Sequence, residues 1–417
     1  MEALQTARRL FDQLAQATAD FPGVTRDSYG EGEAKAHAMI VTEAHRVGLE
    51  AHTDDFGNLY VTLPGADRNL PTLMTGSHLD SVPHGGNFDG AAGVLAGLAL
   101  LETFAQRPTL PFDITLIVIR AEEMIWFPEH YLGSRAAFGL LPSDTPIRVK
   151  RSDTGISLSE YMLSAGFYPD SISHNRASLV PGKIRAFIEL HIEQGPVLVE
   201  RSVPVGIVTA IRANKRYRYC SIVGQTTHAG GVPRSSRHDA LLAGVELAGE
   251  LEKEWIRLES RGEDLVLTIG EFSTDREQHG ITKVPGRVDF TLDFRSQEQA
   301  TLNTFNSFLL KLVRDISQKR GLNIQLGHAT EAASAKMDES MQNTLTKAAK
   351  EIGISTMPIP SGGGHDSAVF AAQGIPTAMV FVRNDKGSHN PDEAMEFDDF
   401  AAAFHVMVRW LENYAVE

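Results

Sequence analysis

Short runs of apolar character, six to eight residues long, recur along this chain, and each is followed by a polar or glycine-rich segment. Runs of this length, rich in Val, Ile and Leu, are typical of buried strands. Helical patterns lie between several of them, for example over residues 90–106. The alternation predicts an α/β fold with a mixed, largely parallel sheet and helices on both faces. The predicted strands are 58–63, 72–77, 114–120, 184–191 and 377–382.

A chain of 417 residues exceeds the usual size of one hydrophobic core, which favours two domains. The segment from residue 213 to residue 330 has a different order of elements from the rest of the chain. Strand, helix, strand, strand, helix, strand is the order of a ferredoxin-like split unit. Because histidine-rich and acidic motifs lie on both sides of it, we predict an inserted α+β domain at 213–330 within a discontinuous domain formed by 1–212 and 331–417. In its first helix, over 237–259, apolar spacing predicts a buried face. That face comprises Leu241, Leu242, Val245, Leu247 and Leu251.

The charge balance limits the partners that this chain can have. Its net charge of −14 argues against nucleic acid or an anionic membrane, because both require basic surface. We therefore expect a small-molecule partner. The N-terminus resembles a surface helix, and no apolar run reaches the roughly 18 residues of a membrane span, which predicts a cytoplasmic protein. A single cysteine, Cys220, excludes a cysteine-based metal cluster, so any metal would be held by His, Asp and Glu.

The stretch GSHLDSVPHGGNFDGAAGV, residues 76–94, gathers potential metal ligands on a flexible backbone. His78 and Asp80 lie two residues apart at a predicted strand end, so their side chains point the same way. One can then bind a metal while the other accepts the imidazole N–H. Asp89 follows at the entry to a predicted helix, where a carboxylate is favourably placed.

Three further clusters of ligand-type residues also follow predicted strands. Glu122 and Glu123 end IVIRAEEM, FIELHIEQGP carries His191, and His389 lies in the loop after TAMVFV. Because a sheet of this class builds its site beyond the strand ends, we expect these side chains to meet in a metal centre. The expected ligands are His78, Asp89, Glu123, His191 and His389.

Five imidazole and carboxylate groups exceed what one tetrahedral catalytic zinc requires. If Asp89 bridges, they suit two divalent ions. Glu122, beside the ligand Glu123, is then the candidate general acid and base. A metal-binding protein without catalysis would be credible only if Glu122 or a ligand were missing, and all are present.

Several motifs together resemble the hydantoinase/carbamoylase family of binuclear zinc-dependent amidohydrolases, which is related to aminoacylase-type metallopeptidases. The motifs cover nearly the whole chain. They are GSHLDSV, GGNFDGAAGV, AEE, FPEHYLGSRA, ELHIEQGPVLVE, GQTTHAGGVPRSSRHDAL, FTLDFR, SGGGHD and GSHNPDE.

The resemblance implies roles by position. It assigns the same five metal ligands, Glu122 as general base and Asp80 as the residue that orients His78. It makes 213–330 a dimerisation and lid domain of a homodimer, in which His228 reaches the partner's site and polarises the scissile carbonyl. Arg295 would bind a substrate carboxylate, a task that suits its two-pronged donor. Further substrate contacts are implied at Gln194 and Gly363.

The chain departs from the family pattern at two places. Met124, Ile125 and Trp126 replace small and basic residues beside Glu122, and Thr282 stands where the pattern has a substrate-binding asparagine. Trp126 could equally pack in the core or contact substrate.

These observations favour the metal-dependent hydrolysis of a linear C–N amide, foremost in an N-carbamoyl-L-amino acid, with an apolar part in the substrate. Alternatives are an allantoate or ureidoglycolate amidohydrolase, and an N-acyl amino acid amidase or dipeptidase. We expect two divalent ions per subunit. Zinc is favoured, and Mn, Co or Ni would also suit the ligands.

Overall fold

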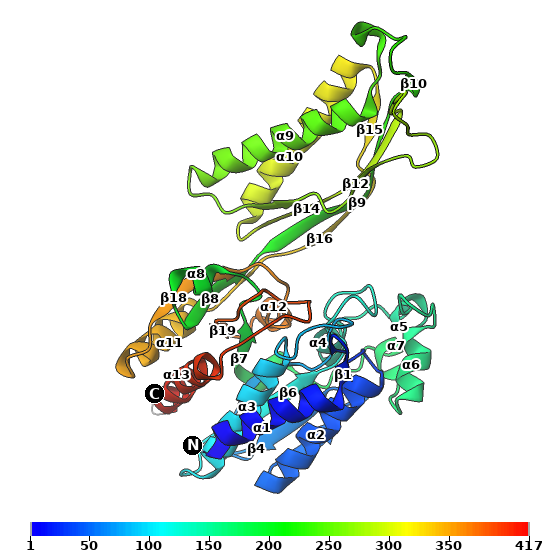
Figure 1. The fold of residues 1–417 in the computed structure, drawn as a ribbon. Helices are drawn as coiled ribbons and strands as arrows, with labels where there is room; N and C mark the ends of the chain where they lie inside the picture. Colours follow the sequence, from blue (N-terminus) through cyan, green and yellow to red (C-terminus); the bar gives the residue numbers. More distant parts are fainter. Residues whose placement is uncertain (1, 416–417) are drawn as a thin grey trace. The chain divides into compact units, whose positions relative to one another are not determined.

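The chain folds into two compact units (Figure 1), and the computed structural model describes residues 2–415. The first unit comprises the residues up to Thr209 together with those from Lys336 onward, and the second comprises Ala210–Ala335. The second unit is therefore an insertion in the sequence of the first. Its limits by internal contacts are 210 and 335, against the 213 and 330 expected from the sequence.

A nine-stranded sheet forms the centre of the first unit, in the order β17-β8-β19-β7-β5-β6-β4-β3, with β18 also paired to β8. The central strands β19, β7, β5 and β6 are parallel to one another, whereas β8, β4 and β3 join antiparallel at the sides. The predicted mixed, largely parallel sheet is thus confirmed. The strands are β3 (Glu50–Thr53), β4 (Leu59–Leu63), β5 (Thr72–His78), β6 (Ile114–Ile119), β7 (Ile184–Ile192), β8 (Val205–Ile211), β17 (Ala335–Lys336), β18 (Thr356–Ser361) and β19 (Thr377–Val382).

Both faces of this sheet are covered, because successive residues of a buried strand enter different cores. In β6, Leu116 and Val118 belong to the core that α1, α2, α3, α11 and α13 complete. Ile117 and Ile119 belong to a core on the other face, together with Phe370 of α12. The helices are α1 (Glu2–Ala17), α2 (Glu31–Val47), α3 (Ala91–Ala105), α4 (Leu132–Ala137), α11 (Glu339–Glu351), α12 (Ser367–Ala372) and α13 (Phe397–Tyr414).

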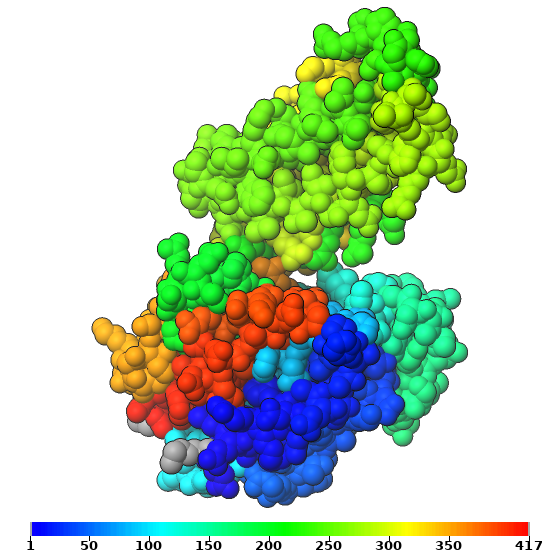
Figure 2. All heavy atoms as spheres, in the orientation of Figure 1, coloured from blue at the N-terminus to red at the C-terminus, as the bar shows by residue number. Residues whose placement is uncertain are grey.

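The N-terminal and C-terminal parts of the chain pack together in the first unit. Phe11 of α1 and Phe400 of α13 meet edge to face, with ring centroids 5.2 Å apart. Figure 2 shows the deep-blue N-terminal helix beside the orange-red C-terminal segment. Short elements complete this unit. They are β1 (Ala19–Asp20), β2 (Gly23–Val24), α5 (Thr145–Arg148), α6 (Leu158–Ser164), α7 (Asp170–Ser173), the 3-10 helix Pro181–Lys183 and α8 (Val197–Arg201).

The second unit is an antiparallel sheet with two long helices and its own core. The strand order β11-β14-β9-β15, with β12 on β14 and β16 on β9, is that of a ferredoxin-like split unit, as predicted. Its elements are β9 (Ala213–Val223), β10 (Thr227–His228), the 3-10 helix Arg234–Ser236, α9 (Ala240–Glu259), β11 (Val266–Thr268), β12 (Phe272–Thr274), β13 (Lys283–Val284), β14 (Arg287–Ser296), α10 (Gln299–Arg320), β15 (Asn323–Gln325) and β16 (Ala329–Ala332).

One detail of α9 differs from the sequence expectation. Leu242 and Val245 were expected on the buried face, but they are 50% and 56% exposed. The buried stripe instead runs through Ala243, Leu247 and Leu251. Small residues hold this stripe at the N-terminal end of the helix, where apolar counting alone selects the larger neighbours. Across residues 2–415, no helix combines the length and the apolar character needed to cross a bilayer.

Candidate metal centre

The four central strands bring the expected ligands to one edge of the sheet. β6, β5, β7 and β19 are neighbours and run parallel, so their carboxyl ends meet. His78 is the last residue of β5, and His191 lies at the end of β7. Glu123 and His389 follow β6 and β19 in the connecting loops. Asp89 lies just before α3. The sequence prediction that these five side chains lie close together matches this geometry.

Asp89 is at the centre of the cluster. Its Oδ1 atom lies 3.2 Å from His191 Nε2 and 3.6 Å from His78 Nε2. Its Oδ2 atom lies 3.1 Å from His389 Nε2, which is itself 3.4 Å from Glu123 Oε1. Two ligand groups therefore share one carboxylate, with all donor atoms in each group within 4.8 Å of one another.

A third group of potential ligands, Glu189, His191 and His365, shares His191 with the first group. Two of its members already have polar partners. Glu189 accepts hydrogen bonds from the hydroxyls of Ser77 and Ser367, at 2.8 and 2.6 Å. His365 Nε2 lies 2.8 Å from the hydroxyl of Ser361. We therefore assign this group to the support of the cluster.

The polar atoms at the centre fit a bound divalent cation. Asp89 Oδ1 and His191 Nε2 are buried and have no hydrogen-bond partner among residues 2–415, although buried polar atoms are almost always paired. His78 Nδ1 and His191 Nδ1 lie 3.0 and 2.9 Å from the backbone carbonyls of Asp80 and Ile192. The tautomer that donates to these carbonyls leaves Nε2 with a free lone pair directed at Asp89. This is how metal-binding histidines are usually held.

The electrostatics of the cluster also favour a cation. Burial opposes ionisation of Asp89, but the neighbouring imidazole rings of His191, His389 and His78, when protonated, outweigh it and hold the pKa of this carboxyl well below its usual range. The hydrogen bond to Asp89 raises the pKa of His389 to about 9. Burial, with the charge of Asp89, raises the pKa of Glu123 to about 7. The raised pKa values of His389 and Glu123 mean that, without a metal, protons bound by these residues reduce the negative charge of the cluster, as a bound cation would.

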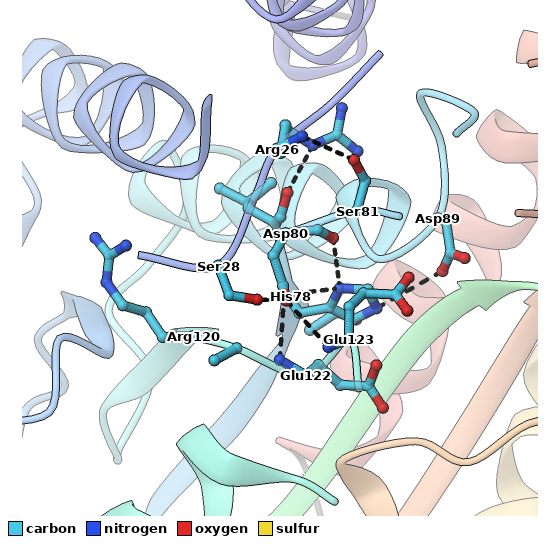
Figure 3. A network of polar contacts seen from close by, with 12 residues as sticks. Arg26, Ser28, His78, Asp80, Ser81, Asp89, Arg120, Glu122 and Glu123 are labelled. Carbon is cyan, nitrogen blue, oxygen red and sulfur yellow. Dashed lines mark hydrogen bonds and ion pairs between the residues drawn. The ribbon is translucent and has the colours of Figure 1, made fainter. Parts of the chain in front are cut away.

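Asp80 connects the histidine to the turn that carries the two glutamates. Its carboxylate lies 3.4 Å from His78 Nδ1 and accepts the backbone N–H groups of Glu122 and Glu123 at 3.2 and 3.0 Å. Figure 3 shows these contacts converging on Asp80. The position agrees with the orienting role expected from the sequence.

Glu122 differs from its neighbour Glu123 in its surroundings. Its side chain keeps partial exposure and makes no hydrogen bond to any described residue. Burial of the carboxyl by the surrounding protein raises the pKa of Glu122 well above its ordinary value, and the charges of Glu123 and Asp366 add to this effect. An unpaired carboxyl group with a raised pKa beside a cluster of ligands is suited to proton transfer.

Gln194 and Gly363 also lie at this centre. The Gln194 side-chain amide donates to Asp89 Oδ2 at 2.8 Å. A Cβ at Gly363 would approach Gln194 Oε1 to 2.8 Å, so a side chain at this position would require the Gln194 amide to shift. Gln194 thus contacts the ligand Asp89 directly, and Gly363 lies next to Gln194.

The other three expected site residues belong to the second unit. His228, in β10, is exposed, and its Nδ1 accepts the backbone N–H groups of Gly230 and Gly231 at 3.1 and 2.9 Å, so Nε2 carries the ring proton. Thr282 is exposed, and its carbonyl accepts the N–H of Ala229 at 2.8 Å. Arg295, in β14, contacts Asp293 at 2.8 Å. The metal cluster, by contrast, lies entirely in the first unit.

Two residues of the cluster had no role in the sequence analysis. Glu393 accepts the N–H groups of Phe88 and Asp89 at 2.8 and 3.2 Å, and the hydroxyl of Ser388 lies between Glu393 and Asp89. They tie the loop of Asp89 to the loop of His389. Ser388 and Glu393 both belong to the motif GSHNPDE, which also contains His389. A single sequence does not distinguish a metal ligand from a residue that holds the ligand loop in place.

Trp126 packs in the core. It is 7% exposed and belongs to a cluster with Tyr29, Phe56 and Phe127, and its indole N–H donates to the carbonyl of Ser81 at 2.8 Å. The alternative of a substrate contact is therefore not supported. Ile125, which is 50% exposed, is the accessible apolar residue of this segment.

Residues 74–413 match the family described as peptidase family M20/M25/M40. The chain belongs to this family. It is 33% identical over 387 residues to N-carbamoyl-L-amino acid amidohydrolase of Geobacillus stearothermophilus, covering 92% of each chain. It is 33% identical over 384 residues to allantoate amidohydrolase of Bacillus subtilis (strain 168), covering 91% of this chain and 90% of the relative.

A solved structure is similar along the whole chain. The hydantoinase/carbamoylase family amidase from Burkholderia multivorans superposes with a TM-score of 0.89 at 27% identity, covering 99% of this chain and 98% of that one. These findings confirm the expected resemblance, the fold class and an amidohydrolase-type enzyme. The ligand clusters agree with metal binding.

Proposed function

We propose that this enzyme hydrolyses the carbamoyl group of an N-carbamoyl-L-amino acid, with two divalent metal ions per subunit. One molecule of water is consumed, and the products are the amino acid, ammonia and carbon dioxide. The observation that carries the proposal is Asp89, whose two oxygens face two ligand groups beside the unpaired carboxyl of Glu122. The similarity to N-carbamoyl-L-amino acid amidohydrolases supports the choice of substrate.

In this proposal each residue has a defined task. His78, Asp89 and His191 would hold one ion, and Asp89, Glu123 and His389 the other. When bound, such ions stabilise developing negative charge and acidify the attacking water. The ligands suit Zn, Mn, Co and Ni, and we favour zinc because the family that the sequence resembles is zinc-dependent. Glu122 takes the proton of the water and delivers it to the leaving nitrogen.

The remaining residues would bind and orient the substrate. The planar guanidinium of Arg295 can bind the carboxylate of the amino acid with two parallel hydrogen bonds, in exchange for its contact with Asp293. His228 presents its Nε2 proton for the carbonyl oxygen that gains charge. Gln194 and the open backbone at Gly363 lie beside the ligands. At the asparagine position of the family pattern, Thr282 offers a shorter side chain, which would leave room there.

A substrate panel tests the proposal. Purified enzyme, with each divalent metal in turn, should release ammonia from N-carbamoyl-L-amino acids, and fastest from those with an apolar side chain, because Ile125 is accessible beside Glu122. N-carbamoyl amines without a carboxylate and the D-enantiomers serve as controls and should react poorly. Preference for allantoate or ureidoglycolate would replace the proposed substrate with the second candidate, which the 33% identity to an allantoate amidohydrolase favours. Turnover of only N-acyl amino acids or dipeptides would contradict both.

The partners follow from charge and composition. A net charge of −14 disfavours binding to nucleic acid and to anionic membranes, because both are negatively charged. The proposed partners are therefore a small carboxylate-bearing substrate and a second copy of the chain. Cys220 is free and buried, in keeping with a reducing cytoplasm.

A homodimer through the second unit is part of the proposal, with His228 acting in the partner's site. Mixing inactive His228→Ala subunits with inactive Glu122→Gln subunits should restore activity after exchange, because one site of each mixed dimer then has both residues intact. The activity of each mixed dimer should approach half of the activity of a wild-type dimer. Exchange proven by mass spectrometry without recovered activity would place His228 in its own subunit's site or outside catalysis.

A further inference from the structure

The backbone turn that carries Glu122 and Glu123 is held by two buried carboxylates. Three successive N–H groups point at them. The N–H of Ala121 donates to Glu33 Oε1 at 3.3 Å, and those of Glu122 and Glu123 donate to the two oxygens of Asp80. Ala121 has a φ of 53°, in the left-handed region that a residue with a Cβ seldom adopts. The turn therefore depends on these acceptors for its shape.

Glu33 reaches this turn from α2. It is fully buried, and its second oxygen accepts the guanidinium of Arg120 at 2.6 Å and the N–H of Tyr29 at 2.7 Å. The Arg120 guanidinium also donates to the carbonyl of Gly57 at 2.9 Å. Glu33 thus fixes both residues that precede the glutamate pair.

Ser28 holds the other carboxylate. Its hydroxyl donates to Asp80 Oδ2 at 2.6 Å, and both residues are fully buried. Arg26 anchors the same segment to the end of β5, because its backbone N–H donates to Ser81 Oγ at 2.9 Å and its Nε to the carbonyl of Leu79 at 2.6 Å. Figure 3 shows Arg26 and Ser28 beside Asp80, with Arg120 farther to the left and Asp89 on the opposite side.

We propose that Ser28 and Glu33 are positioning residues of the metal centre, through which an N-terminal segment outside the family match at 74–413 fixes Glu122 and Glu123 against His78. Ser28 acts through Asp80, and Glu33 acts through Ala121. The inference rests on the proposed function for its effect on turnover, but its effect on metal binding does not depend on the substrate.

A merely structural role predicts a different outcome. If Ser28 and Glu33 only stabilise the fold, their replacement lowers the melting temperature and leaves the metal affinity of the folded protein unchanged. Glu43 offers a matched control on the same helix. It is 4% exposed and pairs with Arg9 and Arg46 at 2.9 and 2.5 Å, and neither of these ion pairs involves the turn.

The experiment compares Ser28→Ala, Ser28→Thr, Glu33→Gln and Glu43→Gln with the wild type. Zinc affinity is measured by competition with a chromogenic chelator, beside the melting temperature, kcat and KM. Ser28→Ala and Glu33→Gln should bind zinc about 10–100-fold more weakly, as is typical when the support of a ligand is removed. They should also lower kcat more than they raise KM, because Glu122 is displaced. Ser28→Thr keeps the hydroxyl and should recover most of the affinity.

Glu43→Gln should lose stability and keep the wild-type zinc affinity. Unchanged zinc affinity and kcat in folded Ser28→Ala and Glu33→Gln would overturn the proposal. Should Glu33→Gln fail to fold, Ser28→Ala decides, because it removes a single oxygen atom. If the wild type binds zinc but hydrolyses no compound of the panel, the proposed substrate is wrong, while the zinc measurements still test Ser28 and Glu33.

Discussion

Replacing Glu122 with glutamine should lower kcat by about 10²–10⁴-fold, the usual contribution of a general acid–base group, and leave the metal content unchanged. The reason is geometric. Glu122 lies outside both ligand groups, and its side chain has no hydrogen-bond partner among residues 2–415, so the substitution removes a proton acceptor and little else. The measurement is steady-state kinetics beside elemental analysis of the same preparation.

Glu123 provides the contrast to Glu122, since the two residues share one turn. Glu123→Ala should lose metal, because Glu123 belongs to the group of Asp89 and His389. Its activity should then recover in part when the metal concentration is raised. A Glu122→Gln enzyme that turns over normally would show that the proton is taken elsewhere, and one that loses its metal would make Glu122 a ligand.

Removing the metal should abolish turnover altogether. We expect complete loss after dialysis against a chelator and recovery on addition of Zn²⁺, Mn²⁺, Co²⁺ or Ni²⁺, because histidine and carboxylate ligands accept each of them. Asp89→Ala should have the same effect without a chelator, since Asp89 belongs to both ligand groups. Elemental analysis should find two ions per wild-type chain and close to none in the variant.

His84 supplies a control for the Asp89 variant from the same loop. His84 Nδ1 lies 3.0 Å from the backbone carbonyl oxygen of Asp20, and His84 belongs to none of the ligand groups. His84→Ala should therefore retain metal and activity. Full activity of demonstrably metal-free wild type would contradict a metal-dependent mechanism. A single ion per chain with full activity would reduce the centre to one metal.

The fold could be predicted because the apolar pattern is strong where the chain is most buried. The predicted strand 377–382 coincides with β19, and 184–191 differs from β7 by one residue. Strands buried on both faces read as continuous apolar runs, which few other elements imitate. The apolar run DLVLTIGEFS, residues 264–273, predicts a single strand, but the structure divides it into β11 and β12, because the ladder with β14 is interrupted at residues 269–271.

The ligand positions could be predicted because the parallel strands bring their carboxyl ends together. The roles of these residues stay predictions until the variants are measured. Ser28 and Glu33 could not have been found, because neither lies near a ligand in the sequence and serine and glutamate are common at helix starts. Only the three-dimensional contacts with Asp80 and Ala121 distinguish them.

The insertion of the second unit between β8 and β17 has a consequence for the order of events during synthesis. His78, Asp89 and His191 leave the ribosome before residue 210, whereas His389 follows the whole insertion. The group of Asp89, Glu123 and His389 is therefore complete only after residue 389 has been made. The second unit, whose core is drawn from within Ala210–Ala335, can reach its fold earlier. A nascent chain that stops before residue 389 consequently lacks one of the two ligand groups, even when the second unit has already been synthesised.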